Sequence, residues 1–67
     1  MFYKGQVVKL VGYSKSYKVL VTGKGDCHNE FAGVIIETEY DDNYKNGELS
    51  VGTYATDYHI GEFKKVN

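Results

Sequence analysis

The densest apolar run of the chain covers residues 31–39, Phe-Ala-Gly-Val-Ile-Ile-Glu-Thr-Glu. Its β-branched and aromatic content suits a pleated strand, and the run is too short and too rich in Val, Ile and Thr for a convincing helix. Gly33, in the middle of the run, indicates a bulge, a sharp bend or a close approach of another backbone. We therefore expect this segment to be the central strand of a small β protein.

Side chains alternate between the two faces of a strand. In the central segment this places Phe31 and Ile35 on one face and Val34 and Ile36 on the other. Because both faces carry apolar groups, we expect both to be covered, at least in part.

Four further segments show the alternation or the flanking turn residues of short strands. They are residues 2–11, 17–22, 52–58 and 63–66. Alternation selects Val8 and Leu10 as core residues of the first segment. It places Tyr54, Thr56 and Tyr58 on one face of the third.

The connection after the central strand, residues 40–47, is polar and acidic. It ends in Asn46-Gly47, a strong signal for a tight type I′ turn, after which we expect residues 49–51 to re-enter the sheet. Residues 59–62 are long enough for a single 3₁₀ turn before the last strand.

Five short strands in 67 residues, with no helical period, predict one all-β domain that spans residues 1–67. The order of hairpin, loop, central strand, hairpin, 3₁₀ turn and terminal strand is that of a five-stranded SH3-like barrel. An OB-fold is the alternative, although it needs more residues and usually a helix between its third and fourth strands.

Two segments carry a resemblance to a family. Residues 31–36, F-x-G-x-[VI]-[IV], and residues 51–58 followed by Phe63 are similar to the C-terminal half of short uncharacterised proteins of tailed phages and prophages. That family typically shows [VG]-G-x-Y-S-x-x-W-x(4)-F. Here Tyr58 replaces the tryptophan, and residues 45–50 lengthen the acidic connection. The resemblance implies a phage or prophage origin and an SH3-like fold, and it carries over no catalytic residue.

The charge and the cysteine content limit the kinds of partner and the cellular compartment that fit this chain. The chain has eight lysines, nine acidic residues and no arginine, so its formal net charge is −1. No overall field therefore recruits a polyanion, and bidentate phosphate recognition is absent. The single Cys27 cannot form an internal disulfide, and neither a signal peptide nor a membrane-spanning run is visible. We expect a cytoplasmic protein that binds no membrane.

Tyrosines are the first candidates for a functional surface. Tyr13, Tyr17 and Tyr58 are candidates to line an apolar groove for a protein partner. Alternatively, they cover the ends of the barrel with their hydroxyls in water. Asp41 and Asp42 belong to an acidic surface that either solvates the connection or binds a basic patch on a partner. Peptide-binding SH3 domains use a tryptophan pair and a proline that this chain lacks.

Nucleic-acid binding is an alternative. Lysines concentrate in the first third of the chain, so Lys15 and Lys18 together with Tyr3 are candidates for a platform that stacks single-stranded bases. The near-zero net charge and the lack of arginine argue against this interpretation.

Metal binding and catalysis have weaker support. Residues 26–30 together with His59 gather thiol, imidazole and carboxylate groups, but not at the spacing of structural zinc sites. Asp41-x-Asn43 begins like a calcium loop, which Lys45 interrupts where an oxygen ligand is needed. Cys27, His28, Asp57 and His59 form no recognisable catalytic arrangement. We expect no metal, no cofactor and no enzymatic activity.

The sequence therefore predicts a small non-enzymatic protein-interaction module, a phage or prophage accessory protein that binds a host or phage protein. Two alternatives remain open. One is a barrel that binds single-stranded nucleic acid, and the other is a structural or assembly protein that acts by self-association into a homo-oligomer.

Overall fold

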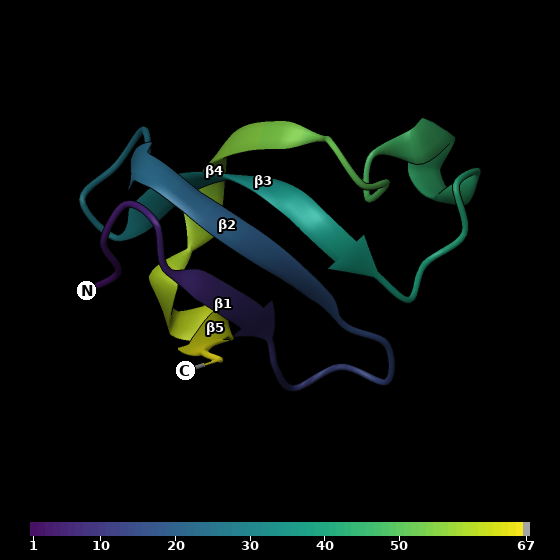
Figure 1. The fold of residues 1–67 in the computed structure, drawn as a ribbon, viewed down its shortest axis with the longest axis horizontal. Helices are drawn as coiled ribbons and strands as arrows, with labels where there is room; N and C mark the ends of the chain where they lie inside the picture. The colour runs from purple at the N-terminus through teal and green to yellow at the C-terminus, as the bar shows by residue number, and fades with distance from the viewer. Residues whose placement is uncertain (67) are drawn as a thin grey trace.

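The structure, a computed structural model, describes residues 1–66 as one sheet of five antiparallel strands in the order β4-β3-β2-β1-β5 (Figure 1). The predicted all-β class is confirmed, and the described residues contain no α-helix. The strands are β1 (Val7–Leu10), β2 (Tyr17–Lys24), β3 (Glu30–Thr38), β4 (Tyr54–His59) and β5 (Phe63–Lys65), with 3₁₀ turns η1 (Tyr44–Gly47) and η2 (Ile60–Glu62).

β4 and β5 are the two edge strands, and across residues 1–66 no strand pairing joins them. The short turn η2 leads from one edge to the other, as the sequence predicts for residues 59–62. Its carbonyl at Glu62 accepts a hydrogen bond from the N–H of Val11, 3.0 Å away. The sheet therefore wraps around a core without closing through a continuous ladder of hydrogen bonds.

The core lies inside this curved sheet. Ile35, in the central strand, is fully buried, and Phe31 is surrounded by other aromatic rings. Val8 and Leu10 belong to the core, which confirms the face predicted for the first strand. The core residues are Val8, Leu10, Val19, Val21, Phe31, Ile35, Tyr58 and Phe63.

β1 is shorter than the predicted strand of residues 2–11. Gly5 has a φ of 94°, and the N–H of Gln6 donates to the carbonyl of Tyr3 at 3.0 Å. The amide oxygen of Gln6 in turn accepts the Tyr3 N–H at 2.8 Å. The chain therefore turns before it enters the sheet, because the Gln6 side chain closes a local ring that alternation does not reveal.

The connection from β3 to β4 also differs from the prediction. Asn46 and Gly47 have φ angles of 60° and 84°, and the Glu48 N–H donates to the Lys45 carbonyl at 3.2 Å, which agrees with a type I′ turn. This turn joins no strands, however. Residues 49–51 do not re-enter the sheet, and Val51 is 62% exposed.

Three β-bulges shift the register between neighbouring strands. In each of them one strand has an extra residue, which is Thr22 in β2, Ile36 in β3 and one residue between Ala55 and Tyr58 in β4. Each extra residue changes which face the following side chains meet. The sequence predicts that both faces of the central strand are covered. Ile36 is 43% exposed, so this expectation is wrong at Ile36. Tyr54 is 58% exposed while Tyr58 is buried, so these two tyrosines do not share a face as predicted.

Gly33 marks a close approach between strands. A Cβ at this position would overlap the Val19 side chain and lie 2.7 Å from the Leu20 carbonyl oxygen. Of the three interpretations that the sequence leaves open, the close backbone approach is therefore the one that applies at Gly33 itself. The extra residues nearest to it lie in the neighbouring strands, at Thr22 in β2 and between Ala55 and Tyr58 in β4.

None of the residues that the structure describes belongs to a helix with the length and apolar character needed to cross a membrane.

Candidate protein-binding site

Four tyrosines make a row of ring contacts that runs from the core to the surface, and we call Tyr58, Tyr17, Tyr40 and Tyr44 the tyrosine row. The ring centroids of Tyr58 and Tyr17 are 6.3 Å apart, those of Tyr17 and Tyr40 are 6.2 Å apart, and those of Tyr40 and Tyr44 are 4.7 Å apart. Tyr58 is 8% exposed and Tyr44 is 41% exposed. The row is therefore anchored in the core and open at its other end.

Local hydrogen bonds place the outer members of the row. The Tyr40 N–H donates to the Thr38 hydroxyl at 3.0 Å as the chain leaves β3. The Tyr40 hydroxyl donates to the Lys15 carbonyl at 3.4 Å, which ties it to the connection between β1 and β2. The Tyr44 N–H then donates to the Asp41 carbonyl at 3.0 Å, so a tight turn brings the Tyr44 ring back onto Tyr40.

Tyr13 lies beside the row and is 58% exposed. Its hydroxyl donates to the Glu62 carboxylate at 3.3 Å. The negative charge of Glu62 and this hydrogen bond raise the pKa of Tyr13, because both favour the protonated phenol. Glu62 therefore positions Tyr13 and supplies a negative charge at the same end of the molecule.

The inner members of the row, the buried Tyr58 and the half-buried Tyr17, are neutral at physiological pH. Burial raises the pKa of Tyr58 to about 12, with further contributions from the charges of Asp57 and Glu48. Burial also raises the pKa of Tyr17 well above its ordinary value, and the neighbouring Tyr58 adds to the effect. The row therefore offers apolar ring faces and neutral hydroxyl donors.

These shifts predict a loss of stability in alkali. A folded-state pKa above the unfolded value means that the unfolded chain loses its phenolic protons first, so stability falls as the pH rises above about 10. We expect the urea midpoint to be unchanged from neutral pH up to that point and to decrease between pH 10 and pH 12. Replacing Tyr58 with phenylalanine should weaken this dependence. An alkaline decrease of the same size in the Tyr58→Phe variant would contradict the assignment.

Two lysines rest on the outer rings. The Lys15 ammonium lies 5.9 Å from the centroid of Tyr40, and the Lys45 ammonium lies 5.6 Å from the centroid of Tyr44. Such distances allow an attraction between a cation and the negative face of the ring. The exposed faces of the row can therefore receive cationic side chains.

The structure brings together most of the residues that the sequence selects for protein binding. Tyr17 and Tyr58 are in the row, Tyr13 lies beside it, and the exposed Asp41 and Asp42 lie in the connection between its two outer members. Tyr58, however, is buried and forms the floor of the site rather than its surface.

Sequence analysis missed two members of the row, Tyr40 and Tyr44, because they belong to a connection that composition marks as polar and acidic. Their spacing of four residues was the available signal. Residues four apart come to one side when a chain makes a helical turn. The turn that the Tyr44 N–H closes onto the Asp41 carbonyl, just before η1, does this here.

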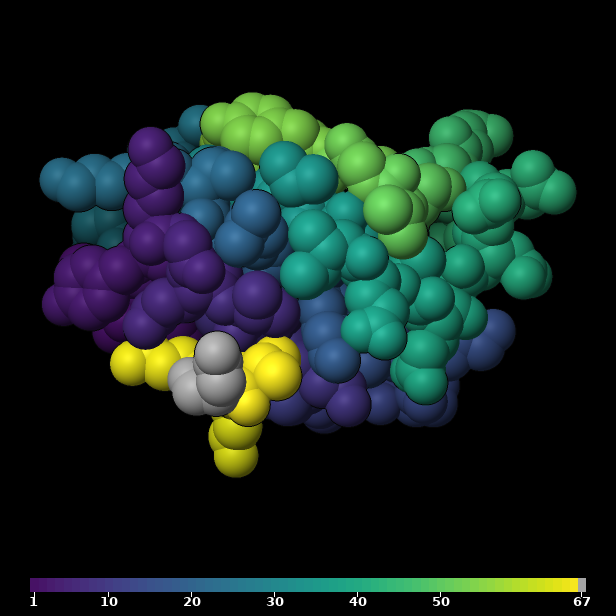
Figure 2. All heavy atoms as spheres, viewed as in Figure 1, coloured from purple at the N-terminus to yellow at the C-terminus, as the bar shows by residue number. Residues whose placement is uncertain are grey.

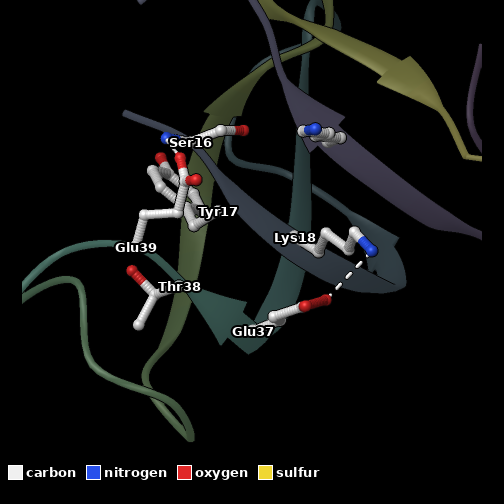
Figure 3. A pocket seen from close by; sticks show the side chains of 7 residues that line it. Ser16, Tyr17, Lys18, Glu37, Thr38 and Glu39 are labelled. Atoms are coloured by element: carbon white, nitrogen blue, oxygen red, sulfur yellow. Dashed lines mark hydrogen bonds and ion pairs between the residues drawn. The ribbon is translucent and has the colours of Figure 1, made fainter. Parts of the chain in front are cut away.

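A hollow with a volume of about 170 Å³ lies beside the row, where β2 begins and β3 ends. Figure 3 shows the side chains that line it. The Ser16 N–H donates to the Glu39 carboxylate at 2.6 Å, and the Lys18 ammonium lies 2.9 Å from the Glu37 carboxylate (Figure 3). Small-molecule sites usually enclose about 300–1,000 Å³. This hollow is smaller, and of its four charged groups Lys18, Glu37 and Glu39 already have partners within the chain.

The residues selected for nucleic-acid binding do not converge. Lys15 precedes the first residue of β2, whereas Tyr3 lines a hollow with Lys24 at the other end of the same strand. Lys18 lies between these positions and forms the ion pair with Glu37. The structure therefore does not bring Tyr3 and the two lysines to one platform.

The residues considered for metal binding and catalysis lie around Glu30. Within residues 1–66, no group of three or more His, Cys, Asp or Glu side chains is placed to hold a metal ion. Cys27 is exposed, and the charge of Glu30 raises the pKa of its thiol, which disfavours the reactive thiolate. The nearest imidazole contact of Glu30 is His59, at 3.8 Å.

Protein-family models, curated protein sequences and solved structures give no match to this chain.

Proposed function

We propose that this chain is a small non-enzymatic module that binds another protein through the tyrosine row and Tyr13. The observation that carries the proposal is the gradient of exposure along the row, from the buried Tyr58 to the open Tyr44. A rigid aromatic surface anchored in the core gives a large contact area at a small entropic cost, which is typical of the centre of protein interfaces.

The charges around the row favour a partner segment that carries cationic and apolar side chains. Glu62 lies against Tyr13, and Asp41 and Asp42 lie beside the outer rings. Lys15 and Lys45 already occupy two ring faces. A lysine or arginine of the partner would take the place of these two mobile side chains on the rings and would lie close to the carboxylates.

We further propose that the fold is an SH3-like barrel and that the protein is an accessory protein of a phage or prophage. The strand order, the turn η2 before the last strand and the curvature of the sheet support the first statement. The resemblance of residues 31–36 and 51–58 to short phage proteins supports the second. On this proposal the partner is a host or phage protein.

The experiment is a comparison of immobilised variants in a bacterial lysate, followed by titration of the purified captured protein. We expect the wild-type chain to retain one stoichiometric partner. Tyr13→Ser and Tyr44→Ser should each weaken binding about tenfold or more, because exposed interface tyrosines are frequent hot spots.

The matched control is Tyr3→Ser, which removes a tyrosine that is at least as exposed as Tyr13 and Tyr44 but lies at the far end of β2. Binding that is lost equally in the control, or retained in both row variants, would contradict the proposal. Salt-sensitive retention of single-stranded oligonucleotides without a protein partner would support the nucleic-acid alternative instead. A concentration-dependent mass in light scattering, sensitive to the row variants, would support self-association.

A further inference from the structure

The outer face of the sheet carries a second surface, independent of the tyrosine row. On this face a line of apolar side chains crosses four strands, since Val7 of β1 pairs with Leu20 of β2, Leu20 with Val34 of β3, and Val34 with Tyr54 of β4. The N–H of Val66, the residue that follows β5, donates to the Val7 carbonyl at 3.0 Å, and Val66 therefore continues the line on the other side of β1. We call Val66, Val7, Leu20, Val34 and Tyr54 the apolar row.

The apolar row is accessible. Tyr54 is 58% exposed and Val66 is 46% exposed, while the three residues between them are half-buried. Figure 2 shows β1, β2 and β3 side by side on one face in purple, blue and teal, with β4 in light green above and β5 in yellow below. Ile36, at the bulge of β3, adds a further side chain that is 43% exposed.

A line of charges runs beside the apolar row. Lys9 lies directly between Lys64 of β5 and Lys18 of β2 in the strand register, and Lys18 pairs with Glu37 of β3. We call Lys64, Lys9 and Lys18 the lysine row. Among the described residues, Glu37 provides the only ion pair with a member of this row.

This arrangement is unfavourable for the isolated chain. Like charges directly opposite each other on neighbouring strands destabilise a sheet, and Lys9 faces a lysine on both sides. Residues that break such a local rule without a compensating contact often serve function rather than folding. An anionic group seated along the lysine row would remove the repulsion.

The neighbouring apolar row selects the class of anion. Single-stranded nucleic acid stacks its bases on aromatic rings, and Tyr54 is the only ring of the row and lies at the end away from the lysines. Membrane surfaces are bound by apolar groups that insert several ångströms, whereas Val7, Leu20 and Val34 are half-buried in the sheet. A protein element with its own apolar stripe fits the surface better.

The dimensions favour a helix. Five strands span about 19 Å at their usual spacing, the length of a helix of about 13 residues. The turns of a helix repeat about every 5.4 Å, close to the 4.8 Å between strands, so each turn can place one apolar side chain over one strand.

We propose that the outer face of the sheet binds an amphipathic helix of a partner protein, with its apolar stripe on the apolar row and Asp or Glu side chains along the lysine row. This surface lies outside the site proposed above, so either can fail without the other.

The probe is a synthetic helical peptide of about 14 residues with a leucine stripe flanked on one side by glutamates. Its control has lysines in place of the glutamates. We expect the glutamate peptide to bind at low salt and its affinity to decrease as the salt concentration increases. Its binding should shift the amide resonances of Val7, Leu20 and Val34 of the protein. The lysine peptide should bind at least about tenfold more weakly.

The deciding variant is Lys9→Glu. This substitution should raise the melting temperature, because the new carboxylate would face Lys64 and Lys18. It should nevertheless weaken the binding of the glutamate peptide at least about tenfold. The matched control Lys24→Glu, at the end of β2, should leave binding unchanged.

Equal binding of both peptides, or undiminished binding by Lys9→Glu, would overturn the proposal, as would the absence of binding to either peptide. Binding of anionic vesicles or of an oligonucleotide through the lysine row, with no binding of the glutamate peptide, would likewise overturn it in favour of that other partner.

Discussion

Replacing Gly25 with alanine is expected to destabilise the protein by about 3 kcal/mol or more, at or above the upper end of the usual cost of overpacking. A Cβ at Gly25 would lie 2.6 Å from three backbone atoms, the Glu30 carbonyl carbon, the Phe31 nitrogen and the Thr56 carbonyl oxygen. Backbone atoms of two strands cannot move aside as the end of a side chain can. The substitution therefore has to move the loop that joins β2 and β3 away from both the start of β3 and β4.

Two hydrogen bonds would be lost with that separation. The Gly25 N–H donates to the Glu30 carbonyl at 3.2 Å, and the Asp26 N–H donates to the Thr56 carbonyl at 2.8 Å. The measurement is urea unfolding followed by circular dichroism. A chain of this length has about 3–10 kcal/mol of stability in total, so Gly25→Ala should leave much of the protein unfolded at ambient temperature.

Gly23→Ala is the matched control, because Gly23 lies only two residues before Gly25, near the end of β2. A Cβ at Gly23 meets nothing within 4 Å. Alanine there should change the free energy of unfolding by less than about 1 kcal/mol, since it also restricts the unfolded chain. A Gly25→Ala variant as stable as this control would show that the loop and β4 do not approach as closely as the structure indicates.

Truncating Phe31 to alanine is expected to cost about 3–5 kcal/mol, the range typical of large aromatic residues in a core. The Phe31 ring is 2% exposed, and its centroid lies 5.1 Å from that of Phe63, 5.4 Å from that of Tyr58 and 5.4 Å from that of Phe2. These rings join the two edge strands across the interior. Their loss should therefore reduce the cooperativity of thermal unfolding as well as the midpoint.

The control for Phe31 is Tyr3→Ala. Tyr3 is 64% exposed, and its truncation should alter the stability by less than about 0.5 kcal/mol, as is usual for surface positions. Differential scanning calorimetry on both variants gives the comparison. A Phe31→Ala protein that melts within a few degrees of the wild type would contradict the central position of this ring.

The positions of the strands could be predicted because alternation and turn residues are local signals. Alternation alone assigns Val8 and Leu10 to the core, and the length of the segment before Phe63 predicts the turn η2. The signal fails where a strand gains a residue. The extra residue between Ala55 and Tyr58 turns Tyr54 outward and Tyr58 inward, which depends on the partner strand.

The candidate site was partly visible in the sequence. Tyrosine content and the acidic connection pointed to Tyr13, Tyr17, Tyr58, Asp41 and Asp42, and the structure places these near one another. Tyr40 and Tyr44 were missed because their rings meet through a turn held by backbone hydrogen bonds.

The sequence by itself determined that the chain is all-β, where most of its strands lie and which apolar residues of β1 face the core, because alternation and turn chemistry act within a few residues. Only the tertiary structure decided the register. The bulges, the approach of strands at Gly25 and Gly33, the tyrosine row and the lysine row all arise from contacts between distant segments. A one-residue slip exchanges the faces of a strand, so surfaces of this kind are properties of pairing rather than of local sequence.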